Sequence, residues 1–273
     1  MSFDAVLHIA RARIRVKIAG VDTASAQQLT EKYAAFTVPD EGACHYTLLC
    51  SRGDTAYTTT EARIERLTPT RVKLYGPGLE GELDESSGLA ETRYFTQSIR
   101  PIDNALRLLV SEHLRANDGA LFHAAGLVEA GRGYLFPGAS EAGKTTLARR
   151  AGFAHAMSDE LTAVLPNDDG TFRIAATPFW GDMGHGDLSG DTPLRAIAIL
   201  EGKGKKSCRT LPHAEALQKL LACAFCYSHD ESAAEQLART CEALADVTPV
   251  LAIASEREEP FESVVERVER GIG

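Results

Sequence analysis

The sequence has no long hydrophobic run and no excess of positive charge. Because it lacks a stretch of about 18 uninterrupted apolar residues, we expect no membrane-spanning helix. The first residues lack the basic and apolar segments of a secretory signal, which favours a cytoplasmic protein. The net charge of −9 argues against binding to nucleic acid or to an anionic membrane. It still allows a local basic site, such as a phosphate pocket.

The cysteines do not repeat in a metal-binding pattern. Of the six, Cys223 and Cys226 have CxxC spacing, and no second CxxC follows. The apolar pattern around them predicts a helix over residues 213–227. We therefore interpret the pair as buried thiols, with a metal or redox site as the alternative. Reduced thiols are typical of the cytoplasm.

The length and composition are those of a globular protein with one large domain or two small ones. The chain has 273 residues, of which 44% are hydrophobic, enough for a sizeable core. Short strand-like runs separated by turn-like segments predict a β-rich N-terminal region over residues 1–98. This region has no recognisable catalytic or binding motif. Its expected elements are a short helix over 24–36 and strands over 5–9, 14–18, 45–49, 56–60 and 71–75. We expect residues 99–273 to form a nucleotide-binding domain.

The most informative motif is a phosphate-binding loop. It fits the Walker A pattern G-x-x-x-x-G-K-[ST] and consists of Gly138, Ala139, Ser140, Glu141, Ala142, Gly143, Lys144 and Thr145, followed by Thr146. The glycines let backbone N–H groups face an anion, and the lysine places a charge on the outer phosphates. The threonine hydroxyl can ligate Mg²⁺. The motif predicts binding of ATP and Mg²⁺.

The surroundings of the loop support this interpretation. An apolar run at 134–136 predicts the strand that enters the loop, and residues 146–151 predict the helix that leaves it. Glu141 stands where many such loops have glycine or a neutral residue. Its carboxylate would either lower the affinity for a triphosphate or lie on the solvent side of the loop.

The loop is flanked by strands rather than by alternating strands and helices. A helix over 101–117 precedes a hairpin of 120–129 with 133–136, and a second hairpin joins 161–165 to 171–175. A strand over 153–157 would end at Asp159 and Glu160. Further along we expect a Gly- and Asp-rich loop at 181–191, strands at 194–200 and 250–254, and helices at 231–245 and 260–270. This pattern differs from a doubly wound fold.

Several of these residues together carry a resemblance to a known family. His123 precedes the loop, the loop follows a hairpin, and Asp159-Glu160 closes the next strand. With the segment 177–182, this set resembles the kinase domain of HPr kinase/phosphatase and its small relatives, over roughly residues 118–260. The resemblance implies an α/β fold shared with phosphoenolpyruvate carboxykinase: a P-loop domain with a mixed, strand-rich sheet, preceded here by the β-rich N-terminal part.

The resemblance also implies roles for individual residues. Lys144 and Thr145 match the phosphate-binding lysine and the Mg²⁺-binding hydroxyl. Asp159 matches the aspartate that takes the proton from the acceptor, and His123 the histidine near it. Glu160 or Asp182 would help to hold Mg²⁺. From the residues alone, His123 is equally compatible with the core, and Asp159 with water-mediated Mg²⁺ binding without base chemistry. Arg195, at the start of the strand expected over 194–200, is a weaker candidate for a contact with the γ-phosphate.

The chain also departs from that family. Its acidic pair is Asp-Glu where the HPr enzymes have aspartates, and it lacks their C-terminal signature and regulatory domain. The sequence thus predicts an ATP-dependent kinase that acts on a hydroxyl of a peptide, protein or small metabolite. The alternative is a nucleotide-binding scaffold or sensor, and carboxykinase-like chemistry ranks last. The absence of Asn-Lys-x-Asp favours ATP over GTP. Relatives of the HPr group form oligomers, so the resemblance implies a homo-oligomer.

Overall fold

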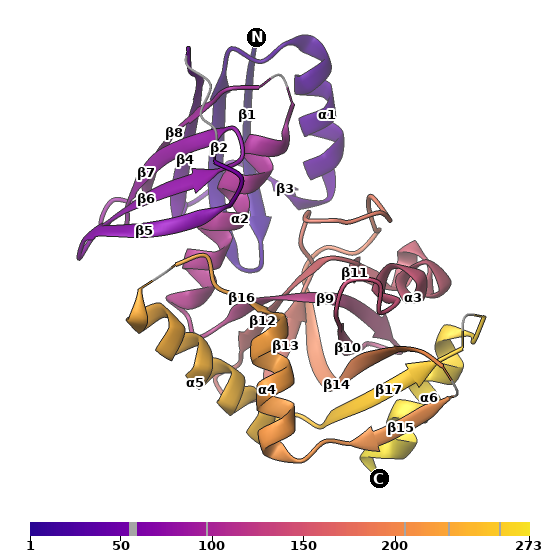
Figure 1. Cartoon of the computed structure of the whole chain (residues 1–273). Coiled ribbons are helices and arrows are strands. Elements are labelled where there is room, and N and C mark those ends of the chain that lie inside the picture. Colours follow the sequence, from indigo (N-terminus) through magenta and orange to yellow (C-terminus); the bar gives the residue numbers. More distant parts are fainter. Residues whose placement is uncertain (55–58, 97, 205, 229, 257) are drawn as a thin grey trace. The chain divides into compact units, whose positions relative to one another are not determined.

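A computed structural model describes residues 1–273 apart from 55–58, 97, 205, 229 and 257 (Figure 1). The chain divides into two compact units. Unit 1 comprises Met1–His113 and Cys226–Ala234, and unit 2 comprises Leu114–Phe225 and Glu235–Gly273. Each contains a mixed sheet, which confirms the expected α/β class with a β-rich N-terminal part. No helix in the described part of the chain is long and apolar enough to cross a membrane.

Unit 1 is built on an eight-stranded sheet in the order β3-β1-β2-β4-β8-β7-β6-β5. Strand β4 pairs in parallel with β2 and β8, and the other neighbours are antiparallel. The strands are β1 (Ser2–Ile9), β2 (Ala12–Ala19), β3 (Thr37–Val38), β4 (Tyr46–Arg52), β5 (Arg63–Thr68), β6 (Arg71–Gly76), β7 (Leu79–Asp84) and β8 (Leu89–Tyr94). The strand predicted over 56–60 falls largely outside the described residues.

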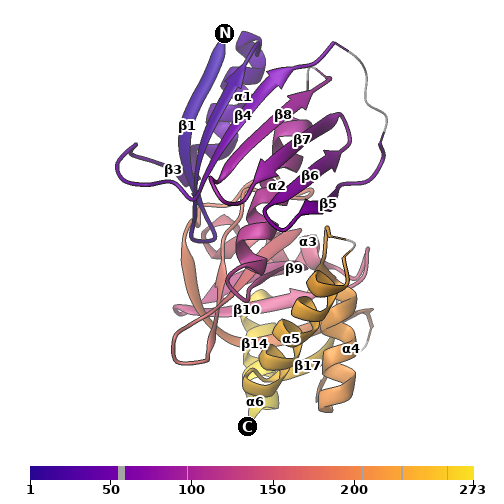
Figure 2. The ribbon, with the colours of Figure 1, turned by 90° about the vertical axis from the view of Figure 1, so that its left-hand side faces the viewer.

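Two helices, α1 (Thr23–Tyr33) and α2 (Arg100–Arg115), cover one face of this sheet (Figure 2). A short 3₁₀ helix, η1 (Ala34–Phe36), follows α1. The strands alternate buried and exposed residues, as expected for a sheet with one covered face. The hydroxyl of Tyr33 on α1 donates to Asp103 on α2 at 2.7 Å, so the two helices are also joined to each other.

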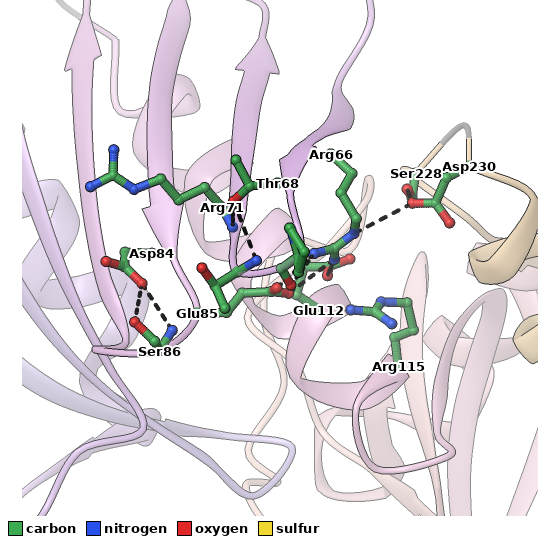
Figure 3. A network of polar contacts seen from close by, with 12 residues as sticks. Arg66, Thr68, Arg71, Asp84, Glu85, Ser86, Glu112, Arg115, Ser228 and Asp230 are labelled. Carbon is green, nitrogen blue, oxygen red and sulfur yellow. Dashed lines mark hydrogen bonds and ion pairs between the residues drawn. The ribbon is translucent and has the colours of Figure 1, made fainter.

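A polar network around Arg66 stabilises one end of unit 1 (Figure 3). The guanidinium forms two hydrogen bonds with Glu85, at 2.7 and 3.1 Å. Further carboxylate oxygens lie 3.7 Å away on Glu112 and 3.9 Å away on Asp230. The pKa of Arg66 is raised, chiefly by its hydrogen bonds with Glu85. The cation is therefore already matched by carboxylates of its own unit.

Unit 2 contains a nine-stranded sheet that closes on itself. Strand β10 pairs with both β9 and β14, and the path from β9 to β14 runs through β12 and β13. The strands are β9 (Ala120–Glu129), β10 (Arg132–Pro137), β11 (Ala156–Ser158), β12 (Leu161–Pro166), β13 (Phe172–Ala175), β14 (Asp191–Lys203), β15 (Ser207–Thr210), β16 (Ala224–Phe225) and β17 (Val250–Ser255). Both predicted hairpins, β9–β10 and β12–β13, are confirmed.

The helices of unit 2 pack around this sheet (Figure 1). They are α3 (Lys144–Ala151), the 3₁₀ helix η2 (Phe153–His155), α4 (His213–Cys223), α5 (Glu231–Val247), whose first residues belong to unit 1, and α6 (Phe261–Ile272). The core under the phosphate loop includes Phe136, Leu147, Leu200, Phe261 and Val264. Helices α3 and α6 thus pack with β10 and β14, and this packing fixes the base of the loop.

Two predicted elements were wrong in part. Residues 153–155 form η2 instead of a strand, because Gly152 leaves α3 with a φ of 86° and the N–H of His155 donates back to the Gly152 carbonyl. The helix predicted over 213–227 ends at Cys223. Ala224 and Phe225 pair with Phe122 and Leu121 of β9, and this tertiary pairing overrides the local helical pattern.

Candidate phosphate-binding site

The predicted phosphate loop connects the end of β10 to the start of α3, as the motif requires. Gly138 forms an isolated parallel bridge with Leu200 at the end of β14. A Cβ at Gly138 would lie 2.9 Å from the Cβ of Ala142 and 3.0 Å from that of Leu200. Gly143, with a φ of 108°, precedes the first turn of α3. Both glycines are therefore required by the backbone, at positions that leave the helix N-terminus open to an anion.

Lys144 is buried and lies across its own loop. Its side-chain Nζ donates to the carbonyls of Gly138 at 2.8 Å and Ala139 at 2.9 Å. An ammonium group has three N–H donors, so one is available beyond these two bonds. Burial lowers the pKa of Lys144, while nearby Cys223, Glu160 and Asp159 act in the opposite direction. The cation is thus placed next to the acidic pair that the sequence singled out.

Glu141 is exposed and has a φ of 67°. This left-handed conformation is disfavoured for residues other than glycine, at about 1–2 kcal/mol. The strain explains why glycine is common at this loop position. Its exposure fits the solvent-side alternative, but the residue also lines the hollow described below, so its carboxylate lies near the expected phosphate position.

Asp159 is 1% exposed, and its carboxylate is held by the backbone of a neighbouring loop. Its Oδ1 accepts from the N–H of Gly181 at 2.8 Å, and its Oδ2 accepts from the N–H of Met183 at 3.1 Å. The preceding residue fixes the turn, because the Ser158 hydroxyl donates to the Phe179 carbonyl and accepts from two backbone N–H groups. Asp159 therefore joins the turn after β11 to the segment 181–183.

Strand β9 brings the loop and the acidic pair together. Its first half pairs with β12, with His123 opposite Leu161, and its second half pairs with β10, with Ala124 opposite Pro137. The N–H of Ala124 also donates to the Glu160 carbonyl at 3.0 Å. His123 therefore lies at the point of β9 where the pairing with β12 ends and the pairing with β10 begins.

His123 is half-buried, with its ring 6.0 Å from that of Phe225. Burial lowers its pKa, and the nearby Lys144 charge adds to this effect. The lowered pKa favours the neutral imidazole, in which one ring nitrogen is an acceptor.

These residues line one hollow of about 850 Å³. Its walls are His123, Ser140, Glu141, Gly143, Lys144, Thr145, Thr146, Arg149, Asp159, Glu160, Gly181 and Asp182. This lining includes Asp159, which is the predicted base, and also His123. It includes the three predicted magnesium ligands as well: Thr145, Glu160 and Asp182. Hydroxyl and carboxylate oxygens are the donors that Mg²⁺ prefers, usually together with water and phosphate. No group of three or more His, Cys, Asp or Glu side chains suited to a metal occurs among the described residues.

Arg149 is a site residue that the sequence analysis missed. It lies on α3, lines the same hollow, and donates to the Asp182 carbonyl at 2.9 Å. The Walker A pattern ends before this residue. Its spacing of four residues from Thr145, which places the two on one face of α3, was the available signal, but an arginine in the last turn of a helix is also common on a solvated surface.

Arg195 does not reach the site, so its predicted role was wrong. It forms an ion pair with Glu269, with an N–O distance of 3.0 Å. Strand β14 runs parallel to β10, and Leu200, rather than Arg195, is level with Gly138. Five residues of strand correspond to about 16 Å, which places Arg195 at the opposite end.

The CxxC prediction was also wrong in part. Cys223 is half-buried, while Cys226 is exposed, so the two are not a pair of core thiols. Cys223 ends α4 beside the phosphate loop and lines a second hollow with Gly138, Ala139 and Ala142. Burial raises its pKa, and the charge of Lys144 partly offsets this.

The comparison with protein families gives a match over the central part of the chain. The model of the SynChlorMet cassette protein ScmC matches residues 95–246, more than half of the sequence. The chain belongs to the ScmC family. The region matched by the ScmC model contains the phosphate loop, His123, Asp159 and Arg149, and it leaves out β1–β8 as well as β17 and α6. No curated protein matches the chain.

Proposed function

We propose that this protein is an ATP-dependent kinase with an HPr kinase-like P-loop domain. In this proposal it transfers the γ-phosphoryl group to a hydroxyl of a peptide, protein or small metabolite. The observation that carries it is that a complete phosphate loop and the buried Asp159 line the same hollow. We further propose that it works in the cytoplasm, as a homo-oligomer.

The residues of the hollow fit Mg²⁺ and the phosphates of ATP. Gly138 and Gly143 leave room for an anion against the backbone, and Thr145, Glu160 and Asp182 offer hard oxygen ligands. When bound, Mg²⁺ would neutralise charge on the outer phosphates. Lys144 and Arg149 would hold the phosphate oxygens that become more charged during transfer.

Asp159 would accept the proton of the acceptor hydroxyl as its oxygen attacks the γ-phosphorus. The new P–O bond then forms while the bond to the β-phosphate oxygen breaks, and ADP leaves with that electron pair. Its two backbone hydrogen bonds fix the carboxylate in place, and each oxygen keeps a further lone pair. The neutral His123 would orient the acceptor or share its proton.

The same hydrogen bonds favour a second candidate, a nucleotide-binding scaffold or sensor. If Asp159 serves only to hold the segment 181–183, nucleotide binding would be read out by that segment without phosphotransfer. Arg149 also contacts this segment, through the Asp182 carbonyl.

The test measures Mg²⁺-dependent ATP binding by calorimetry and transfer from γ-labelled ATP to a Ser/Thr peptide library. We expect Lys144→Ala to lose binding, and Asp159→Asn to keep binding while losing transfer. Fluorescence of Trp180, the only tryptophan, reports whether the segment next to Asp159 keeps its structure. Tight binding without transfer in the wild type would favour the scaffold, and no binding in the wild type would refute both candidates.

A further inference from the structure

A second hollow lies on the other side of the phosphate loop, within unit 2. Its volume is about 900 Å³, within the range of small-molecule sites. It is lined by the first part of the loop, the end of β14 and one face of α4: Gly138, Ala139, Ser140, Glu141, Ala142, Ile199, Leu200, Glu201, Gly202, Gln218, Lys219, Ala222 and Cys223. Ser140 and Glu141 line both hollows, so the loop is a shared wall.

The two hollows differ in chemistry. The first contains the start of α3 and the carboxylates of Asp159, Glu160 and Asp182. The second has apolar walls from Ile199, Leu200, Ala142 and Ala222. A flat aromatic ring gains free energy against such walls, whereas a triphosphate does not.

Apart from Ser140 and Glu141 of the shared loop, the polar groups of the second hollow lie on α4 and at the end of β14. Gln218 offers an amide donor and an amide acceptor, as the edge of a purine base requires. Glu201 accepts from Lys219 and from Arg209, each at 3.2 Å. A carboxylate held in this way can still accept from sugar hydroxyls, because its oxygens have several lone-pair sites.

We infer that the second hollow binds the nucleoside of the nucleotide whose phosphates bind the loop. This inference rests on the proposed function. The acceptor hydroxyl must reach Asp159, which lines the first hollow and not the second. The first hollow must therefore hold the γ-phosphate, Mg²⁺ and acceptor together, while the base and ribose lie across the loop, against Leu200 and Ala222.

The experiment compares Mg·ATP with Mg·tripolyphosphate, which has the phosphates and no nucleoside. Ala222→Trp fills the second hollow from an exposed position of α4, and Ala214→Trp places the same side chain on an exposed position of the same helix that does not line it. Calorimetry should show at least a tenfold loss of ATP affinity in Ala222→Trp, with tripolyphosphate affinity within twofold of wild type. Ala214→Trp should bind both as the wild type does.

Alkylation of the wild-type thiols with iodoacetamide gives an independent readout. ATP should slow the modification of Cys223 at least fivefold more than tripolyphosphate does, while the exposed Cys226 reacts at an unchanged rate. If Ala222→Trp weakens the binding of ATP and of tripolyphosphate equally, the rate of Cys223 alkylation becomes the deciding measurement. Equal protection of Cys223 by the two ligands would then overturn the inference.

Other outcomes separate the inference from the proposed function. Unchanged ATP affinity in Ala222→Trp would overturn this inference and leave the proposed function standing. If that variant also lost phosphotransfer, the second hollow would be assigned to the acceptor instead. Tripolyphosphate binding as tight as ATP binding in the wild type also overturns it alone. Binding of neither ligand to the wild type refutes the proposed function as well.

Discussion

Each unit of this protein has a hollow of similar size, but the two differ in how their charged groups are held. The hollow of unit 1 measures about 790 Å³ and lies along its sheet, with Lys17, Lys73, Glu82, Glu91 and Arg93 among its walls. These side chains come from alternating strand positions. The first hollow of unit 2, which contains Asp159, measures about 850 Å³ and combines a helix N-terminus, a loop and two carboxylates at a strand turn. Volume alone does not distinguish the two hollows, and our proposal places the site in unit 2 because backbone donors and buried charge converge there.

The two units also differ in how each holds a buried carboxylate. In unit 1, Asp103 is bonded to Lys32 at 2.8 Å and to the Tyr33 hydroxyl at 2.7 Å, with Arg107 3.7 Å away. In unit 2, Asp159 accepts from two backbone N–H groups and borders an open hollow. Asp103 is neutralised by its neighbours, as is Arg66 in Figure 3, while the hydrogen bonds described for Asp159 come from backbone N–H groups rather than from such a cation, and this residue lines a hollow.

The largest expected contrast comes from removing each carboxylate. Asp103→Ala leaves Lys32 without its partner and should lower the free energy of unfolding by about 3 kcal/mol, with phosphotransfer unchanged. Asp159→Ala should abolish transfer at a smaller cost in stability. Circular dichroism follows both units, and Trp180 fluorescence follows unit 2. Equal losses of stability would show that both carboxylates are structural.

Two glycines sharpen the comparison at the backbone. A Cβ at Gly81 in unit 1 would clash with the Glu91 carbonyl oxygen, and a Cβ at Gly138 would meet Ala142 and Leu200. Each alanine variant should cost about 1–3 kcal/mol of stability through overpacking. Calorimetry should show about tenfold weaker ATP binding for Gly138→Ala and unchanged binding for Gly81→Ala. Weaker binding in Gly81→Ala would contradict the assignment of the site to unit 2.

One histidine in each unit allows a further comparison, His113 through the pH dependence of stability and His123 through the rate of transfer. Burial, together with nearby His45 and His8, lowers the pKa of His113 in unit 1 to about 4. Below about pH 6.5 the unfolded chain takes up a proton that the folded chain does not, so stability falls as the pH drops toward 4. With allowance for partial exposure, we expect a loss of about 1–2 kcal/mol between pH 7 and 5.

Chemical denaturation of His113→Gln at the two pH values checks this prediction. The variant should lack most of that loss and keep wild-type phosphotransfer. His123→Gln is the matched change in unit 2, and it should slow transfer at both pH values. A wild-type pH dependence of stability in His113→Gln would assign the titration to another group.

The smallest effect is expected from backbone strain at the loop. Glu141→Gly relieves the positive φ and removes a carboxylate near the phosphates, so we expect a gain of about 0.5–1 kcal/mol in stability and about threefold tighter ATP binding. Glu141→Gln removes the charge and keeps the strain. Ala130→Gly, at a φ of 50° in the β9–β10 turn, should gain stability without any change in binding. Calorimetry and thermal denaturation separate the two contributions.

Local patterns predicted much of the fold of unit 2. The β9–β10 and β12–β13 hairpins followed from apolar alternation around turn residues, and α5 and α6 from helical spacing. Of the two wrong elements, η2 arises from the local turn at Gly152, and the end of α4 from competition between distant segments. Ala224 and Phe225 continue a helical pattern in the sequence, but β9 offers them strand partners, so α4 ends at Cys223.

The phosphate loop was determined by the sequence alone, because its geometry arises from neighbouring residues: glycines that permit the turn, a lysine that folds back on it, and a helix that follows. What lies opposite the loop was decided by tertiary structure. Strand β9 pairs with both β10 and β12, and this register brings His123 and Asp159 to the loop. The parallel pairing of β10 with β14 carries Arg195 to the far end, while one turn of α3 keeps Arg149 in the hollow. Such register depends on packing between segments far apart in the chain, which the spacing of residues along the chain does not encode.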